Sequence, residues 1–287
     1  MNSSLNEALT KKAASLLCEA DGLLITAGAG MGVDSGLPDF RGAEGFWRHY
    51  PALRASGIFF EEIASPVHFP EHPELAWGFY GHRLALYRAT KPHSGFDILR
   101  QIAARLANNA FVFTSNVDGQ FQKAGFGEEQ IVECHGSIHH LQCLQNCCQD
   151  IWSADDFFPE VNVEQCLLLN QAPRCPHCGA LARPNIMMFN DWYWMDTRSR
   201  QQHHRLRAWL QKTKHPVIIE LGAGTAIATV RYFGERQKAP LIRINRDEPE
   251  IKKSARNISI PMGARDALTD IRTALDEMGY FATKSVK

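Results

Sequence analysis

The stretch LLITAGAG, residues 23–30, decides the fold of this chain. A short, continuous apolar run is typical of a strand that is covered on both faces of a sheet. It leads directly into Gly28-Ala29-Gly30, and together they predict a strand, a glycine loop and a helix. The backbone N–H groups of such a loop are suited to approach a pyrophosphate. The loop lacks the third glycine of a dinucleotide fingerprint, because Val33 takes its place. Taken alone, the glycines therefore indicate a tight turn equally well.

The same unit of strand, loop and helix recurs along the chain. Further strands are predicted at 110–114, 131–134, 216–221 and 241–245, and amphipathic helices at 96–106 and 268–278. This alternation predicts a doubly wound, Rossmann-like α/β fold, in which helices cover both faces of a parallel sheet. Ligands bind where such strands end. Nucleotide-binding candidates therefore include Gly222, Gly224, Thr225 and Asn245. Asn245 is a candidate for a ribose hydroxyl, or a simple turn residue.

Two stretches interrupt this rhythm. Residues 43–95 are rich in Trp, Phe and His and contain several prolines, which predicts a helical insertion. Residues 139–182 hold six of the eight cysteines and predict a small metal-binding module. The expected organisation is a nucleotide-binding domain formed by residues 1–138 and 183–287, interrupted by the module at 139–182.

The cysteine spacing indicates zinc. Cys175-Pro176-His177-Cys178-Gly179 has the form of a zinc knuckle, with two thiolates separated by two residues and a glycine to free the turn. Cys143 and either Cys147 or Cys148 supply the other half, with Cys147 favoured and Cys148 left open. Four thiolates make a closed, structural site, because no coordination position remains for catalysis.

Composition excludes several classes of protein. Of 287 residues, 45% are hydrophobic, and 31 basic residues balance 31 acidic ones, so the net charge is zero. A chain that coats DNA or RNA or an anionic membrane needs a basic excess, and neither partner is expected here. No apolar run approaches the roughly 20 residues of a membrane span. The N-terminus lacks the basic segment followed by an apolar segment that is typical of a secretion signal, so we expect the protein to lie in a reducing cytoplasm.

Residues 28–42, GAGMGVDSGLPDFRG, resemble the signature of the sirtuin (Sir2) family. Further matches follow in the family's order. Thr114–Asp118 resembles the T-Q-N-x-D motif, and His135-Gly136 resembles the catalytic H-G motif. Arg183–Phe189 resembles the R-P-x-V-V-x-F stretch, Gly224–Ala226 resembles G-T-S, and Ile244-Asn245 resembles I-N. Cys143 comes eight positions after the histidine, as in the family. The resemblance covers roughly residues 5–280.

The resemblance implies an NAD-dependent removal of acyl groups from protein lysines, with NAD and zinc as cofactors. In that reaction the acyl oxygen displaces nicotinamide from the ribose. His135 then deprotonates a ribose hydroxyl, which attacks the imidate carbon, and water releases O-acyl-ADP-ribose and the free lysine. Asp118 would bind the nicotinamide carboxamide, and Asn116 would order the ribose or a water molecule. The remaining cofactor contacts would come from Gly28, Ala29, Gly30, Asp39, Phe40, Arg41 and Ser115.

Substrate contacts are implied at two places. Met187 and Phe189 would line the channel for the acyl-lysine, although an apolar run after proline also suits a core. Tyr80 and Arg83 are three residues apart and share a helix face. Sirtuins that prefer malonyl- and succinyl-lysine carry Tyr-x-x-Arg here, which predicts an acidic acyl group; the alternative is an arginine that extends to solvent.

Departures from the family pattern keep other functions open. Ser115 replaces a glutamine that normally contacts the ribose and base; the other departures are Gly32, Phe96, Asn190-Asp191 and Ala226. They leave His135 and Asp118 intact but put ordinary peptide deacetylation in doubt. One alternative is an ADP-ribosyltransferase or NAD hydrolase that uses the same pocket. Another is a non-catalytic NAD sensor whose zinc module binds a partner.

Overall fold

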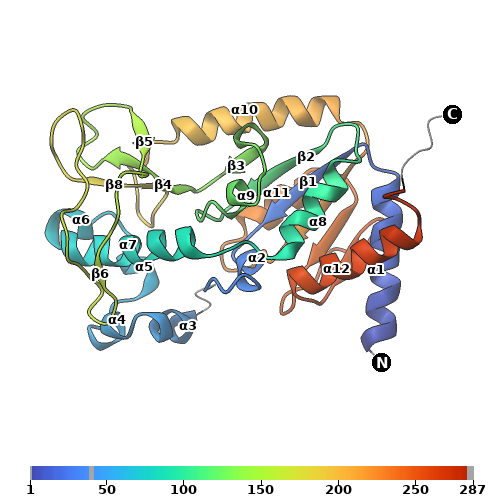
Figure 1. Ribbon diagram of the computed structural model, residues 1–287, viewed down its shortest axis with the longest axis horizontal. Helices are drawn as coiled ribbons and strands as arrows, with labels where there is room; N and C mark the ends of the chain where they lie inside the picture. Colours follow the sequence, from blue (N-terminus) through green and yellow to red (C-terminus); the bar gives the residue numbers. More distant parts are fainter. Residues whose placement is uncertain (1, 39–41, 283–287) are drawn as a thin grey trace.

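A six-stranded parallel sheet organises the larger half of the molecule (Figure 1). The computed structural model describes the chain except for residues 1, 39–41 and 283–287. The strands are β1 (Gly22–Ala27), β2 (Ala110–Thr114), β3 (Ile131–Glu133), β9 (Pro216–Leu221), β10 (Leu241–Ile244) and β11 (Ile258–Ile260). Their spatial order is β11-β10-β9-β1-β2-β3, and every pairing is parallel. Successive strands are therefore added outward from β1 in one direction and outward from β9 in the other, so the switch point of this doubly wound sheet lies between β1 and β9.

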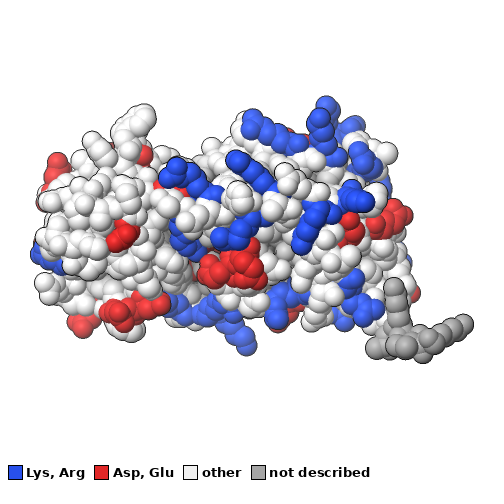
Figure 2. All heavy atoms as spheres, turned by 90° about the horizontal axis from the view of Figure 1, so that it is seen from above, with Lys and Arg blue, Asp and Glu red and all other residues white. Residues whose placement is uncertain are grey.

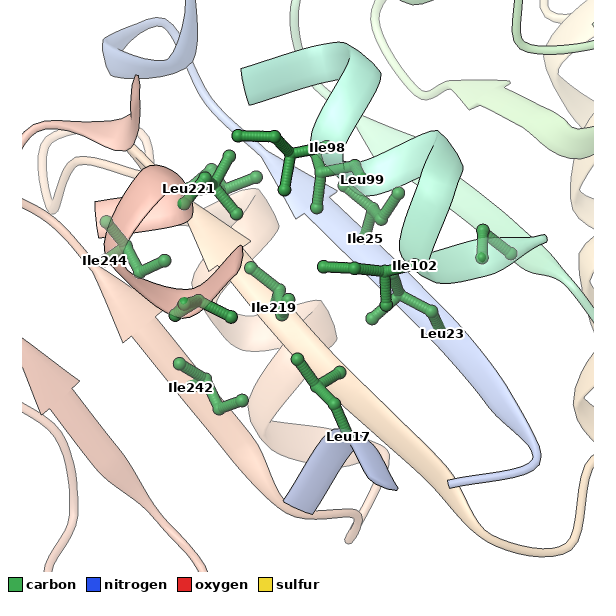
Figure 3. Close-up of a cluster of buried hydrophobic side chains, with 14 of the residues drawn as sticks. Leu17, Leu23, Ile25, Ile98, Leu99, Ile102, Ile219, Leu221, Ile242 and Ile244 are labelled. Carbon is green, nitrogen blue, oxygen red and sulfur yellow. The ribbon is translucent and has the colours of Figure 1, made fainter. Parts of the chain in front are cut away.

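Helices cover both faces of this sheet. Alternate side chains of β1 point to opposite sides, so that Leu23 and Ile25 join one core and Leu24 joins the other. The first core packs against α1 (Asn2–Cys18), α8 (Ser94–Ala103) and α12 (Ala264–Glu277), as Figure 3 shows for Leu17, Ile98, Leu99 and Ile102. The second core packs against α10 (Thr197–Lys212) and α11 (Thr229–Arg236). The predicted fold class is confirmed.

The two interrupting stretches pack together as a smaller lobe, at the left of Figure 1. The first contributes α3 (Gly42–His49), α4 (Pro51–Ala55), α5 (Phe60–Ile63), α6 (His68–Glu71) and α7 (Pro73–Ala89). The second, together with the residues that flank it on both sides, contributes β4 (Gly136–Cys143), β5 (Ile151–Ser153), β6 (Val161–Asn162), β7 (Leu167–Leu168) and β8 (Ala182–Ile186). Phe79 of α7 shares a buried cluster with Leu141 of β4 and Ile186 of β8, and the indole of Trp77 donates to the carbonyl of Ala182 at 3.0 Å.

Short helical segments complete the connections. They are α2 (Gly30–Val33), which follows β1, α9 (Gln120–Lys123), which follows β2, and the 3₁₀ turn η1 (Glu128–Gln130) before β3. Within the part of the chain that the structure describes, no helix has the length and apolar character needed to cross a membrane.

Charge is unevenly distributed although the chain is neutral. Figure 2 looks down onto α10, and Lys and Arg side chains gather there over the larger half, while the smaller lobe shows scattered acidic groups. The helix α10 contains no acidic residue, and its basic residues are Arg198, Arg200, Arg205, Arg207 and Lys212. Arg198 forms an ion pair of 2.5 Å with the buried Glu133 of β3, which attaches α10 to the edge of the sheet.

Candidate functional site

The two predicted glycine loops cross at the switch point. The N–H of Gly28 donates to Leu221 O and that of Gly30 to Gly222 O, each at 3.0 Å. A Cβ on Gly30 would lie 2.7 Å from Gly222 Cα, and Gly222 itself has φ of +57°. These glycines are therefore required because two backbones touch. The N–H groups of Gly28 and Gly30 are thus used within the protein.

The loop after β9 is held by side chains of the loop after β10. Asn245 donates to Ala223 O at 2.9 Å and accepts the N–H groups of Asp247 and Glu248. Glu248 in turn accepts the N–H of Thr225 at 3.0 Å, and also the Thr225 hydroxyl. Asn245 is buried, and these bonds order the loops that carry Gly224 and Thr225. The structure thus supports the turn interpretation of its side chain.

A pocket of about 100 Å³ opens beside this crossing, at the carboxyl ends of β1, β9, β10 and β11. Asp34 lies on its wall and accepts the N–H of Arg265 at 2.9 Å, which ties the pocket to the start of α12. The lining residues are Gly30, Val33, Asp34, Gly222, Ile244, Asn245, Arg246, Asp247, Met262, Gly263 and Ala264. An open pocket at the switch point is where dinucleotides bind in this fold.

The loop after β2 brings two predicted residues to the same edge. The side-chain amide of Asn116 donates to Gly28 O at 3.0 Å, which joins this loop to the glycine crossing. Asp118 is buried, and its carboxylate accepts the N–H of Gln120 at 2.9 Å. Burial raises the pKa of Asp118 to about 6, and the charge of Glu133 adds to this rise. The hydrogen bond from Gln120 and the charge of Arg83 both act in the opposite direction and lower the pKa.

Asp118 should reduce the stability of the empty protein at neutral pH. Its folded pKa is raised, so the fold binds its proton more tightly than the unfolded chain does, and stability falls as pH rises towards 6. We expect Asp118→Asn to stabilise the fold by about 1–3 kcal/mol at pH 8, and by less at pH 5. Urea unfolding at the two pH values measures this difference. An equal loss of stability at both would contradict it.

His135 follows β3 on the neighbouring loop. Because β3 pairs with β2, the Cys134 N–H donates to Thr114 O at 2.9 Å, and the two loops leave the sheet side by side. Within the described residues neither ring nitrogen of His135 makes a hydrogen bond, and burial lowers its pKa. The imidazole is therefore neutral at physiological pH, the form that accepts a proton.

The segment after β8 lies directly against this histidine. The N–H of Met187, just after β8, donates to His135 O at 2.9 Å, and the N–H of Phe189 donates to Ala64 O at 2.9 Å. Met187 is exposed, whereas Phe189 packs edge-on against Phe60, with ring centroids 5.9 Å apart. The segment thus presents one accessible side chain and one that packs against the smaller lobe.

A buried ion pair anchors this segment, and sequence reasoning did not find it. Arg183 and Asp191 form a 2.5 Å ion pair with side chains that are 1% and 0% exposed. Asp191 also accepts the N–H of Met188 and that of Tyr193, at 3.3 and 3.1 Å. The only signal in the sequence was Asp191 at a position where the family carries Glu, which had been noted as a departure. The aspartate closes the loop that follows residues 183–189.

Tyr80 and Arg83 lie on α7, buried in an aromatic shell. The Arg83 guanidinium donates to the Tyr87 hydroxyl at 2.8 and 2.9 Å and lies over the rings of Phe79, Tyr80 and Tyr87. Gln120, whose N–H contacts Asp118, donates to Tyr87 O at 3.1 Å. Arg83 is thus buried near the Asp118 loop rather than extended to solvent.

The four-thiolate cluster includes Cys147. The sulfur atoms of Cys143, Cys147, Cys175 and Cys178 all lie within 4.8 Å of one another. Cys143 and Cys178 are 3.7 Å apart, and Cys147 and Cys175 are 3.5 Å apart. Tetrahedral zinc with bonds of about 2.3 Å separates its sulfur ligands by roughly 3.8 Å, so the donors present fit zinc. Cys148, the alternative that had been left open, lies outside this cluster.

Removal of zinc should loosen the smaller lobe. The metal would join the turn that carries Cys143 and Cys147 to the turn that carries Cys175 and Cys178. Gly179, with φ of +72°, allows the second of these turns to form but does not link it to the first. We expect a strong chelator to lower the melting temperature by roughly 10 °C, equivalent to about 4 kcal/mol. Scanning fluorimetry with parallel zinc analysis measures this. The variant Cys175→Ser should be low in zinc and already destabilised, whereas an unchanged melting curve in zinc-free protein would contradict the assignment.

Asp39, Phe40 and Arg41 lie outside the described residues. Of the other predicted residues, the structure brings Gly28, Gly30, Gly222, Asn116, Asp118 and His135 to one edge of the sheet, together with Ala29, Ser115, Gly224 and Thr225 in the same loops. These loops define a dinucleotide-binding α/β protein with an attached four-cysteine module.

The chain belongs to the Sir2 family, whose profile matches residues 28–226. A protein of Aquifex aeolicus named NAD-dependent protein deacylase is 28% identical over 235 residues, 81% of this chain and 87% of its own. A protein of Pyrococcus furiosus with the same name is 32% identical over 176 residues, 61% and 64% of the two chains.

Solved structures share the fold. A Sir2 homolog in complex with NAD has a TM-score of 0.70 at 21% identity, over 93% of this chain and 94% of that one. Another, solved to explain the mechanism and regulation of Sir2 enzymes, has a TM-score of 0.65 at 22% identity, over 95% and 99%. At these identities the likeness establishes the architecture.

Proposed function

We propose that this member of the Sir2 family is an NAD-dependent protein-lysine deacylase that releases nicotinamide and O-acyl-ADP-ribose. One observation carries the proposal: the Met187 N–H donates to the backbone carbonyl of His135, so residues 187–189, which we propose to contact acyl-lysine, lie next to a residue whose imidazole has a lowered pKa. The names of the relatives support the same activity. The test is the identity of the products formed from NAD and an acylated peptide.

Each part of the site has a separate task. NAD, when bound, supplies a ribose carbon whose leaving group is nicotinamide. The Asp118 carboxyl would hold the nicotinamide carboxamide, and Asn116, fixed to Gly28 O, would order the ribose. His135 would accept a proton from a ribose hydroxyl, since neither of its ring nitrogens is used by the described residues. Met187 and Phe189 would flank the acyl-lysine.

The acyl group that we propose carries a carboxylate. Arg83 is a buried cation, and its hydrogen bonds to Tyr87 lead through Gln120 to the loop of Asp118. A buried guanidinium is a strong site for a carboxylate, because charge-assisted hydrogen bonds are shorter and stronger than neutral ones. Malonyl- and succinyl-lysine place such a group at the end of the acyl chain.

Loss of the Arg83 charge should alter the choice of acyl group. We expect Arg83→Met to reduce kcat/KM for succinyl- and malonyl-lysine peptides about 10- to 100-fold relative to acetyl-lysine, the value of one charged hydrogen bond. The matched control is Arg88→Met, five residues further along the same helix, where the guanidinium donates to Phe157 O and Ala154 O. A clear preference for acetyl-lysine that Arg83→Met leaves unchanged would reject the idea.

We also propose that the protein works in a reducing cytoplasm on an acylated protein. All eight cysteines are free of disulfides, including the four that fit zinc. Thiolates serve as metal ligands in such compartments, where disulfides are rare.

A further inference from the structure

Cys148, the surplus cysteine of the zinc module, belongs to a second group of metal-binding side chains. Its sulfur, a carboxylate oxygen of Asp150 and a ring nitrogen of His177 all lie within 4.8 Å of one another. His177 Nε2 and Asp150 Oδ2 are 2.7 Å apart. The three side chains come from the same two turns that carry the four-cysteine cluster.

The two groups alternate along these turns. Cys147 joins the first cluster and Cys148 the second, while Cys178 joins the first and His177 the second. Since neighbouring side chains in a turn point to different sides, one pair of turns presents ligands on two sides. Zinc in the first cluster would therefore also fix the geometry of the second, and ordering the second set would require little extra entropy.

The chemistry of the second group favours a divalent transition metal. One thiolate, one imidazole and one carboxylate are ligands of the zinc, cobalt, nickel and copper class. Four thiolates around zinc leave a net negative charge next to the site, which attracts a further cation. The side chains of His177 and Asp150 are 50% and 62% exposed. Such an exposed pair stabilises the fold little by itself.

We propose that Cys148, Asp150 and His177 form a second, exchangeable site for a divalent transition metal ion on the outside of the zinc module. Three protein ligands leave one coordination position open to water. Together with the exposure of two ligands, this distinguishes the site from the closed cluster of four thiolates beside it.

Cobalt titration of the full-length protein, first dialysed to one zinc ion per chain so that exchangeable metal is removed, tests the proposal. Because zinc occupies the four-thiolate cluster, we expect one further equivalent of Co²⁺ to bind, with a charge-transfer absorption from a single thiolate. Cys148→Ser should abolish this absorption and weaken Co²⁺ binding at least about tenfold, and His177→Ala should weaken binding by a similar factor. Zinc content should stay at one ion per chain in both variants.

Matched substitutions of exposed residues elsewhere serve as controls. Cys18→Ser in α1 and His204→Ala in α10 should leave the second equivalent of Co²⁺ unchanged. The proposal is overturned if the zinc-loaded protein binds no more Co²⁺ than the Cys148→Ser/His177→Ala double variant. It is also overturned if the thiolate absorption survives in Cys148→Ser.

Discussion

Replacing His135 with alanine should reduce deacylation about 10²- to 10⁴-fold, the usual contribution of a general base. The imidazole is half-buried, burial lowers its pKa, and the Met187 N–H donates to the backbone carbonyl of the same histidine. The backbone should not change, because the turn is set by Gly136, with φ of +80°. The rate of product formation on saturating acyl peptide measures the loss.

A partial reaction separates loss of the base from loss of the fold. His135 acts after nicotinamide has left, so exchange of labelled nicotinamide into NAD, in the presence of acyl peptide, should persist in His135→Ala. The matched control is His140→Ala, a half-buried histidine on β4 with a pKa also lowered by burial, which should keep most of the deacylation rate. A His135→Ala enzyme with more than about a tenth of normal activity would exclude the assigned role.

Breaking the Arg183–Asp191 pair should have the largest effect on stability among these substitutions. Both side chains are fully buried, and Asp191→Asn would leave the guanidinium without its counter-charge. Removing one partner of a buried ion pair typically costs about 3–5 kcal/mol. We expect a loss of that size in urea unfolding, and a raised KM for acyl peptide because the single carbonyl oxygen of Asn cannot replace both acceptors that the N–H groups of Met188 and Tyr193 use.

Two further variants check the cause of this loss. Asp97→Asn removes the partner of Arg100 on the surface, where the aspartate is 65% exposed, and should change stability by less than about 1 kcal/mol. The double variant Arg183→Met/Asp191→Leu removes both charges and should recover much of the stability. If Asp191→Asn is as mild as Asp97→Asn, the pair does not anchor the segment.

Two central strands of the sheet were predictable because they are short, apolar and followed by glycine. The runs at 23–26 and 216–221 correspond to β1 and β9, and the glycines after them meet at the switch point. The strand β11 was missed because it has only three residues and follows a long polar stretch. The knuckle Cys175–Cys178 was predictable from spacing alone, whereas the choice between Cys147 and Cys148 required the geometry of the other turn.

The candidate site was predictable only in part. Asn116, Asp118 and His135 follow adjacent strands, so their place at one edge follows from the fold. The role of Asn245 depended on a carbonyl 22 residues away, and the Arg183–Asp191 pair joins residues on either side of the substrate segment. Such contacts depend on tertiary packing, and no local pattern of residues reports them. The same holds for the packing of 43–95 and 139–182 into one lobe.

The most direct test of the account is mass spectrometry of the products formed from NAD and a panel of acetyl-, malonyl- and succinyl-lysine peptides. We expect nicotinamide, deacylated peptide and O-acyl-ADP-ribose in equal amounts, with the acidic acyl groups processed fastest. Free ADP-ribose formed equally without peptide, or ADP-ribose attached to protein with the acyl-lysine intact, would contradict it. Those products would indicate an NAD hydrolase or an ADP-ribosyltransferase acting from the same pocket.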